Sequence, residues 1–299
     1  MKKDNPYKKK DKYVQIKVQN DAPLLEWLLE NVKQSKSKTK ATLQNRGIKV
    51  NNRIVTQFDF ALHKSDKVFV STTKKNDQFQ SKYVKLVYED RYLVVVEQAH
   101  GILSMGVGKS SLNVKTILDN YFKRSRQKCT AHIVHRLDRE TSGLLIYAKD
   151  METRQILEHE WHNMVYDRRY IAILSGKINT EGGTIANWLK DNKMYVTYSS
   201  PIDNGGKYAV THFHVLNTTD THSLVEFTLE TGRKNQIRVH AVDIGHPVCG
   251  DSKYGNGDDP INRLCLHAYI LCFYHPITHQ PMEFSTQIPI AFKRILEKD

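Results

Sequence analysis

The 299-residue chain lacks the features that mark membrane proteins and disulfide-rich secreted proteins. No apolar run approaches the roughly 20 residues that a membrane-spanning helix needs, so we expect no membrane association. The lysine-rich N-terminus has no apolar stretch after it, so we expect no signal peptide. The four cysteines form no CxxC pair and are too few for a disulfide framework. These absences favour a protein of the reducing cytoplasm.

Acidic residues are scarce in the first quarter of the chain. Between Glu30 and Asp59 the sequence has seven lysines and arginines and no acid. The whole chain has a formal charge of +13, and +9 of it falls in residues 1–73. Basic charge gathered in one terminal segment is typical of a protein that binds a polyanion, because contacts to phosphates release counterions. For residues 1–12 alone, a solubilising basic tail is the simpler interpretation.

The pattern along the chain predicts two folded regions. In "DAPLLEWLLENV" the leucines follow a helical stripe that Asp21 would cap. A short basic helix and a hairpin around Asn51-Asn52 follow. We therefore predict a basic disordered tail at 1–12, a small α/β module at 13–73, a polar linker at 74–82 and a larger domain at 83–299.

In the larger domain, strand patterns interleave with helix patterns without a regular βαβ repeat, which indicates an α+β fold. Helices are expected over "SLNVKTILDNYFKR" and from about Asp150 to Met164. We predict a mixed, mostly antiparallel central sheet that is flanked by helices and carries a central cleft.

The segment "HRLDRETSGLLIYAKD" at 135–150 places Asp138 on a turn just before a buried strand. Taken alone, it reads as a turn with a weak surface ion pair between Asp138 and Arg136 or Arg139. A second segment, "LETGRKNQIRVHAVDIGHPVCGDSKYG" at 229–255, places Arg233 and Arg238 where a strand gives way to a helix. An arginine that faces the core needs an acidic partner, and Asp138 is a candidate. A carboxylate held in this way stays ionised and is available as a nucleophile.

These two segments resemble the signature motifs of pseudouridine synthases of the large-subunit-rRNA type. "YEDRYLVVVEQAHGIL", "RRYIAILSG" and "RLCLHAYILCFYHPIT" are similar to further motifs of that family in the expected order, across residues 83–290. Residues 13–73 resemble the small RNA-binding domain shared by a small-subunit ribosomal protein, tyrosyl-tRNA synthetases and several RNA-modifying enzymes. The resemblance implies an isomerase that converts chosen uridines in structured RNA to pseudouridine. Ribosomal RNA is the expected substrate, with tRNA as the alternative, and a monomer is the expected state.

The resemblance also implies roles for individual residues. Asp138 corresponds to the essential aspartate, Arg238 to the basic residue that pairs with it, and Tyr170 to the tyrosine that packs on the flipped base. Leu266 and His267 fall in a motif of the core around the site. Asn235 departs from the histidine that is usual at its position. Residues expected to contact RNA are His135, Arg136, Arg233 and Gln236 in the catalytic domain, and Lys36, Lys38, Arg46 and Lys49 in the small module.

The reaction implied by the resemblance is redox-neutral and loses no atoms, so we expect no cofactor. The histidines at 132, 135, 159 and 162 lack the spacing of a zinc motif, so we expect no metal. Two other functions stay open at this point. One is an RNA-binding or ribosome-assembly protein that kept the fold and lost the activity. The other is a glycosidase-like hydrolase, which would need a second acid near Asp138.

Overall fold

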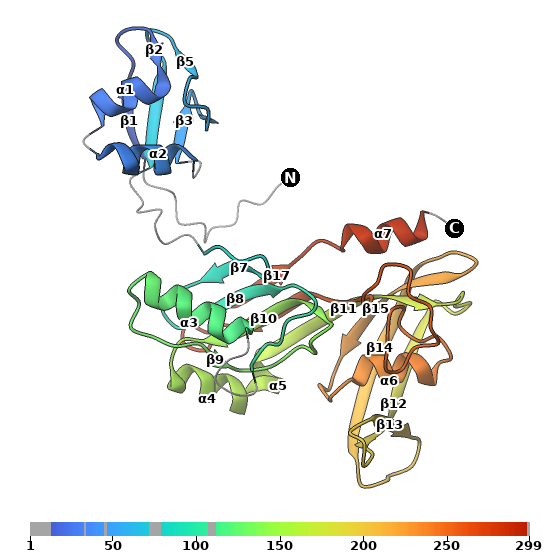
Figure 1. Cartoon of the computed structure of the whole chain (residues 1–299). Helices are drawn as coiled ribbons and strands as arrows, with labels where there is room; N and C mark the ends of the chain where they lie inside the picture. Colours follow the sequence, from blue (N-terminus) through green and yellow to red (C-terminus); the bar gives the residue numbers. More distant parts are fainter. Residues whose placement is uncertain (1–12, 33, 45–46, 72–78, 107–111, 298–299) are drawn as a thin grey trace. The chain divides into compact units, whose positions relative to one another are not determined.

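The computed structural model describes residues 13–32, 34–44, 47–71, 79–106 and 112–297. The chain divides into two compact units, residues 1–78 and 79–299 (Figure 1). The predicted tail at 1–12 and residues 74–78 of the predicted linker lie outside the described part. Within that part, no helix combines the length and the apolar character that crossing a bilayer requires.

The first unit is built on a four-stranded antiparallel sheet with the strand order β1-β6-β3-β4, and β2 pairs with β5 beside it. Two helices complete the unit. The elements are β1 (Tyr13–Lys17), β2 (Ala22–Pro23), α1 (Leu24–Asn31), α2 (Lys36–Gln44), β3 (Ile48–Val50), β4 (Arg53–Ile54), β5 (Ala61–Leu62) and β6 (Lys67–Ser71).

The apolar stripe of α1 forms the centre of this unit, because Leu24, Trp27 and Leu28 are buried against the sheet. Asn51 and Asn52 have positive φ angles of 47° and 68° and form the predicted tight turn between β3 and β4. The prediction that Asp21 caps the helix is wrong.

The helix begins after Pro23, which makes no side-chain cap, and Asp21 instead accepts a hydrogen bond of 2.7 Å from the Lys64 backbone N–H.

The second unit contains an eleven-stranded sheet whose main path runs β13-β12-β14-β15-β11-β16-β10-β8-β7. Strand β17 pairs with β16, and β9 pairs with β10. All pairs are antiparallel except β10 with β16, so the predicted mixed, mostly antiparallel sheet is confirmed. The strands are β7 (Val84–Glu89), β8 (Leu93–Gln98), β9 (His132–Ile133), β10 (Ser142–Ala148), β11 (Val165–Ser175), β12 (Gly182–Asp191), β13 (Thr197–Ser200), β14 (Lys207–Thr218), β15 (His222–Leu229), β16 (Leu266–Tyr274) and β17 (Pro281–Ser285).

Helices cover both faces of the β8–β10 part of this sheet (Figure 1). The helices of the unit are α3 (Val114–Arg124), α4 (Met151–His159), α5 (Trp161–Met164), α6 (Gln236–Asp243) and α7 (Ile290–Leu296). In β10, Leu145 and Tyr147 pack with α3, whereas Leu144 and Ile146 pack with Leu157 of α4. Because alternate residues point to opposite faces, a strand covered on both sides reads as a continuous apolar run.

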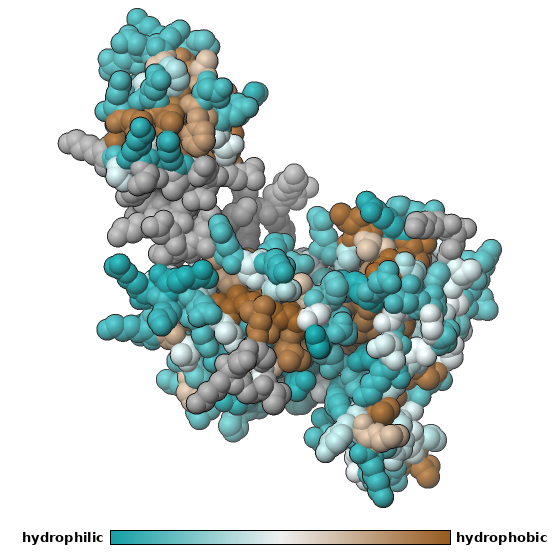
Figure 2. Space-filling view, viewed as in Figure 1, coloured by the Kyte–Doolittle hydropathy of each residue, from teal (hydrophilic) through white to brown (hydrophobic). Residues whose placement is uncertain are grey.

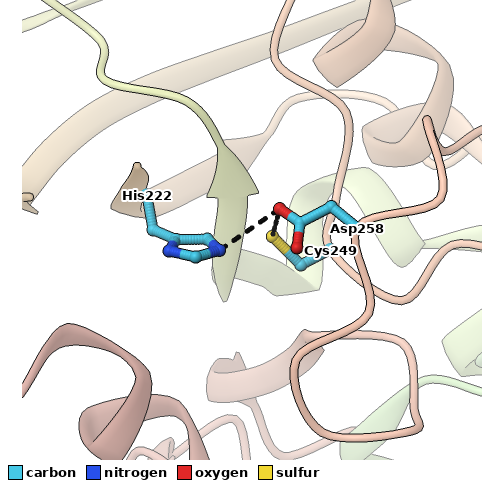
Figure 3. Close-up of side chains that lie close together, drawn as sticks. All are labelled: His222, Cys249 and Asp258. Atoms are coloured by element: carbon cyan, nitrogen blue, oxygen red, sulfur yellow. Dashed lines mark hydrogen bonds and ion pairs between the residues drawn. The ribbon is translucent and has the colours of Figure 1, made fainter. Parts of the chain in front are cut away.

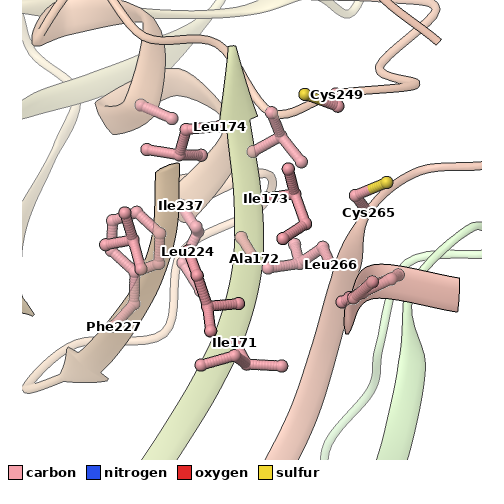
Figure 4. Packing of buried hydrophobic residues seen from close by; sticks show 14 of the residues in the cluster. Ile171, Ala172, Ile173, Leu174, Leu224, Phe227, Ile237, Cys249, Cys265 and Leu266 are labelled. Atoms are coloured by element: carbon pink, nitrogen blue, oxygen red, sulfur yellow. The ribbon is translucent and has the colours of Figure 1, made fainter. Parts of the chain in front are cut away.

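Around β11 the core continues between β15 and β16 (Figure 4). Ile171 and Ile173 of β11 lie in the same cluster as Phe227 of β15 and Leu266 of β16, and Ile237 of α6 joins them. This packing fixes the C-terminal end of β15 and the start of α6 against the centre of the sheet.

The close pairing of β10 with β16 depends on a glycine. Gly143 has a φ of +125° and pairs with Ala268. A Cβ atom at Gly143 would lie 2.2 Å from the Ala268 carbonyl oxygen, so no side chain fits there. This approach brings the residues just before β10 next to the start of β16.

Hydrophilic residues cover most of the face shown in Figure 2. The most exposed apolar side chains of the second unit are Met194, Tyr195 and Ile202, which belong to the loops that flank β13.

Candidate active site

Asp138 occupies the first position of a turn that leads directly into β10. The Asp138 carbonyl oxygen accepts a hydrogen bond of 3.0 Å from the Thr141 N–H. The residues on either side of Asp138 also form hydrogen bonds. Ser104 Oγ lies 3.2 Å from the backbone N and O of Leu137, and the Arg139 carbonyl accepts a hydrogen bond of 2.8 Å from Gly101. These hydrogen bonds hold the backbone around Asp138 in the turn that the sequence predicted.

Arg238, on α6, is the cation nearest to that carboxylate in the described residues. Its Nη1 lies 3.7 Å from Asp138 Oδ2, an ionic contact rather than a hydrogen bond. Its strongest partner is Asp251, which accepts hydrogen bonds of 2.7 Å from Nε and 2.6 Å from Nη2. Arg238 does form the ion pair with Asp138 that the sequence predicted, but Asp251, which the sequence did not reveal, makes the shorter hydrogen bonds to the same guanidinium.

The pKa values of Arg238 and Asp251 follow from the geometry of their contact. Burial alone would lower the pKa of Arg238, but the hydrogen bonds and charge of Asp251, with the charge of Asp138, outweigh it and raise the pKa. Burial alone would raise the pKa of Asp251, but hydrogen bonds and attraction from Arg238 hold it below its usual value. Both groups stay charged at neutral pH, so Arg238 is a permanent cation beside Asp138.

Asn235 sits at the N-terminus of α6 in the left-handed conformation, with φ 55°. Asparagine adopts this conformation more readily than most residues. Its Oδ1 accepts a hydrogen bond of 3.2 Å from Arg238 Nη1, and its Nδ2 donates one of 3.0 Å to the Tyr254 hydroxyl. The Tyr254 ring also lies 5.0 Å from the Arg238 guanidinium. Asn235 thus steers the same nitrogen of Arg238 that faces Asp138.

Tyr170 enters the site from β11, beside an irregularity in the pairing of β11 with β16 between Arg169 and Tyr170. Bulges of this kind re-aim side chains next to active sites. Burial raises the pKa of Tyr170, the positive charge of Arg168 opposes that rise, and the negative charge of Asp138 adds to it. The Tyr170 hydroxyl is therefore neutral at physiological pH, and it lies close enough to Asp138 for the charge of that carboxylate to affect its pKa.

His135 is neutral and half-buried, and its hydrogen bond is made within its own domain. Burial lowers its pKa to about 3, with a further contribution from the positive charge of Arg168. Its Nε2 accepts a hydrogen bond of 3.1 Å from the Ile146 N–H, and its ring lies 4.7 Å from the ring of Trp161. These contacts attach the segment before Asp138 to β10 and α5.

A cleft of about 450 Å³ joins these residues. One wall comes from the segment 134–141, and the opposite wall comes from 229 and 232–238. Tyr170, Leu266 and Ile237 contribute to its lining, and Trp161 with Arg168 closes another side. The volume lies in the range of small-ligand sites. The central cleft predicted from the sequence is present, and Asp138, Tyr170 and Arg238 all line it.

The residues of this domain that were expected to contact RNA differ in their exposure and in how many of their hydrogen-bonding groups are already engaged. Arg136 is exposed at the cleft, and Arg233 is half-buried there, with its Nε donating to the Tyr208 carbonyl at 3.0 Å. Gln236 is buried, and its amide is fully engaged. It accepts from Thr231 Oγ1 and the Arg233 N–H and donates to the Val210 carbonyl and Thr211 Oγ1. With no hydrogen-bonding capacity left, Gln236 fixes the loop and is not a substrate ligand.

The remaining expected RNA contacts lie in the first unit. Lys36 begins α2 and is exposed, and Lys49 on β3 places its Nζ 4.2 Å from the centre of the Tyr13 ring. Arg46 and the side chain of Lys38 lie outside the described residues.

Leu266 and His267 belong to the buried surroundings of the site, as predicted. His267 links Ser142 Oγ, at 2.8 Å, to Thr286 Oγ1, at 2.7 Å.

Sequence reasoning missed Asp251, Tyr254 and Arg168. Asp251 and Tyr254 lie in the "GDSKYG" stretch, and Arg168 lies two positions before Tyr170. A second acid, Glu158, also lines the cleft, but its carboxylate accepts hydrogen bonds of 2.9 and 3.0 Å from Arg154.

Comparisons with known proteins agree on one family. The sequence profile described as RNA pseudouridylate synthase matches residues 60–242. The chain is 31% identical over 280 residues to the "Uncharacterized RNA pseudouridine synthase YhcT" of Bacillus subtilis (strain 168), covering 90% of this chain and 92% of that protein. It is 31% identical over 278 residues to the "Ribosomal large subunit pseudouridine synthase D" of Buchnera aphidicola subsp. Baizongia pistaciae (strain Bp), covering 86% of each. The solved structure "Human RNA Pseudouridylate Synthase Domain Containing 1" superposes with a TM-score of 0.58 at 25% identity, covering 70% of this chain and 86% of that one.

Proposed function

Because the chain belongs to the RNA pseudouridylate synthase family, and is therefore an RNA-modifying isomerase, we propose that it converts particular uridines of structured ribosomal RNA to pseudouridine through Asp138, without a cofactor. The ribosomal substrate is suggested by relatives named ribosomal large subunit pseudouridine synthase D. The supporting observation in the site is the carboxylate of Asp138, carried on a turn and facing Arg238 Nη1 at 3.7 Å in the cleft.

The chemistry explains why an ionised carboxylate is needed. The bond between ribose C1′ and uracil N1 breaks, the base turns, and a new bond forms between C1′ and C5; the hydrogen at C5 leaves as a proton and N1 takes up a proton, so the product is an isomer of uridine. While the base is detached the sugar is electron-poor, and a carboxylate can stabilise or trap it, as in glycoside hydrolysis. Addition of Asp138 to the sugar and removal of a ribose proton by Asp138 are both consistent with this geometry.

The cleft suits the detached base. Tyr170 offers a π-face for stacking, and its neutral hydroxyl lies near the carboxylate. Leu266 and Ile237 give the lining an apolar part. A water-poor lining favours return of the base to the sugar over hydrolysis.

Positively charged side chains around the cleft supply contacts to RNA that offset the free-energy cost of base flipping. Removing a uridine from its stack costs a few kcal/mol. Arg136, Arg168 and Arg233 line the cleft and can contact RNA phosphates or fill the place of the extruded base.

We also assign RNA binding to the first unit. Its lysines at 36 and 49 and the basic run from 33 to 53 fit contacts with the phosphate backbone. Such contacts select RNA by its shape rather than its base sequence.

The test compares RNA from a deletion strain with RNA from the same strain complemented by the wild-type protein or by Asp138→Asn. Pseudouridine mapped across all RNA should disappear at one or a few uridines and return only with the wild-type protein. Return with both proteins would remove Asp138 from the mechanism. An unchanged map in the deletion strain would support an RNA-binding protein without activity. Release of free uracil in vitro would support the hydrolase, for which Glu158 is the available second acid.

A further inference from the structure

A second constellation of reactive side chains lies outside the cleft, where β15 begins. His222 at the start of β15 and Cys249 and Asp258 at the two ends of one loop turn their donor atoms toward one another (Figure 3). His222 Nε2 lies 3.2 Å from Asp258 Oδ2, Cys249 Sγ lies 3.3 Å from the same oxygen, and all three donor atoms lie within 4.8 Å of one another. None of the three lines the cleft.

Two of these separations, 3.2 and 3.3 Å, lie close to the edge length of a tetrahedral metal site. Zinc binds sulfur, nitrogen and oxygen at about 2.0 to 2.3 Å, so two donors in a tetrahedron lie about 3.3 to 3.8 Å apart. The donors therefore need to move little to receive an ion. A thiolate, an imidazole and a carboxylate together suit zinc, whereas magnesium and calcium prefer oxygen ligands alone.

The surrounding structure holds each donor in place. His222 Nδ1 lies 2.8 Å from Thr221 Oγ1, which leaves Nε2 directed at the cluster. The backbone of Cys249 is bonded on both sides: its N–H donates to Ile173 at 2.9 Å, and its carbonyl accepts from Cys265 at 2.9 Å. The Asp258 carbonyl accepts a hydrogen bond of 2.7 Å from Gly250.

We propose that His222, Cys249 and Asp258 bind one zinc ion, with water as the fourth ligand. The ion joins the start of β15 to both ends of the loop 249–258. That loop carries Asp251 and Tyr254, which contact Arg238. The zinc ion therefore has a structural role: it stabilises the loop that positions Arg238, and it takes no part in the reaction.

A simple triad of hydrogen bonds is the alternative. In it Cys249 donates to Asp258, Asp258 contacts His222, and metal adds nothing. The two explanations differ in metal affinity and in the spectrum of a bound cobalt ion, and neither readout depends on enzymatic activity.

The experiment uses the full-length protein, stripped with a chelator and titrated with Zn²⁺ and with Co²⁺. We expect one tight site per chain, a cobalt spectrum with thiolate charge-transfer and tetrahedral bands, and a melting temperature that rises by about a few degrees with zinc. Cys249→Ser and the isosteric Asp258→Asn should each weaken binding about tenfold or more and abolish the zinc-dependent shift in melting temperature. Cys249→Ser should also remove the thiolate band.

The matched control is Cys265→Ser, which changes a buried thiol outside the cluster and should keep the site. Since histidines elsewhere can bind zinc weakly, the comparison with Asp258→Asn separates this site from them. Zinc affinity equal in wild type and both cluster variants, or a cobalt spectrum without a thiolate band in the wild type, would overturn the proposal.

Discussion

Arg238 points its Nη1 atom at Asp138 Oδ2 across 3.7 Å, while its other nitrogens are committed elsewhere. Nε and Nη2 form the two short hydrogen bonds to Asp251, whose side chain is fully buried. Asp251 thus fixes the orientation of the Arg238 guanidinium. The Asp138 carboxylate, which lines the cleft, therefore lies beside a positive charge whose position is fixed. This arrangement leads to predictions for the residues on both sides of the arginine.

Asp251→Asn should destabilise the protein and reduce activity together. Removing one partner of a buried ion pair leaves an uncompensated charge, which typically costs about 3–5 kcal/mol. The free energy of unfolding, measured by urea denaturation, should fall by about that amount. Asp220→Asn is the control, because its side chain is 94% exposed in a surface pair with Lys177 and should change stability little. Equal stabilities of the two variants would contradict the assigned role of Asp251.

Asn235→His should make the activity depend on pH. The amide of Asn235 keeps its contact with Arg238 Nη1 at any pH, whereas a protonated imidazole would repel the guanidinium. Burial and the guanidinium charge lower the pKa of an imidazole at this position below its usual value of about 6.5, so we expect the variant to match wild type at neutral pH and to lose activity only as the pH falls well below about 6.5. The readout is the ratio of variant to wild-type rate across pH, with the exposed Asn217→His as control. A ratio that does not change with pH would show that Asn235 does not steer Arg238.

Acid should destabilise the catalytic unit through two buried histidines. Burial lowers the pKa of His240 and of His267 to about 4, from an ordinary value of 6.5. The unfolded chain therefore binds protons that the folded one rejects, so stability is full above about pH 6.5 and falls as the pH drops toward 4. Each histidine should contribute about 3 kcal/mol of loss near pH 4.

The check is the free energy of unfolding from pH 8 to 4. His240→Gln, which can keep hydrogen bonds to Thr211 and Asn187, should flatten the acid limb relative to wild type. An acid limb of unchanged steepness in that variant would contradict the assignment to His240.

Removing residues 1–73 should weaken RNA binding and flatten its salt dependence. Each phosphate contact that the basic unit makes adds to the slope of log affinity against log salt. Binding of structured ribosomal RNA is measured at several salt concentrations for the full chain and for the truncated protein, whose second compact unit begins at residue 79. The same slope for both proteins would remove the RNA-binding role assigned to the first unit.

Local features of the fold were predictable from the sequence because short-range patterns determine them. The helix over "SLNVKTILDNYFKR" begins at Val114, with Asn113 accepting a hydrogen bond of 3.0 Å from the Thr116 N–H. The Asn51-Asn52 turn and the buried strand after Asp138 are likewise where the pattern placed them. The strand order was not predictable, because no local pattern records that β10 lies beside β16 as a parallel neighbour.

The site was predictable only in part for the same reason. The resemblance to known motifs singled out Asp138, Tyr170 and Arg238, and all three line one cleft. The predicted contact between Arg238 and Asp138 is present, but the second partner of Arg238 was missed, because sequence spacing does not show that Asp251 forms the short hydrogen bonds. Gln236 carries a side chain suited to RNA contacts, and only the structure shows that its amide is already fully bonded.

The most direct test of the central claim measures isomerisation and RNA affinity in the same Asp138→Asn sample. Formation of pseudouridine displaces the hydrogen at C5, so ribosomal RNA from the deletion strain, tritiated at uridine C5, releases tritium to water once per turnover. Asp138→Asn should release none above background while its RNA affinity stays within a few-fold of wild type. Asp220→Asn should match wild type in both. Tritium release by Asp138→Asn at the wild-type rate, or parallel loss of RNA affinity and activity, would contradict a catalytic role for Asp138.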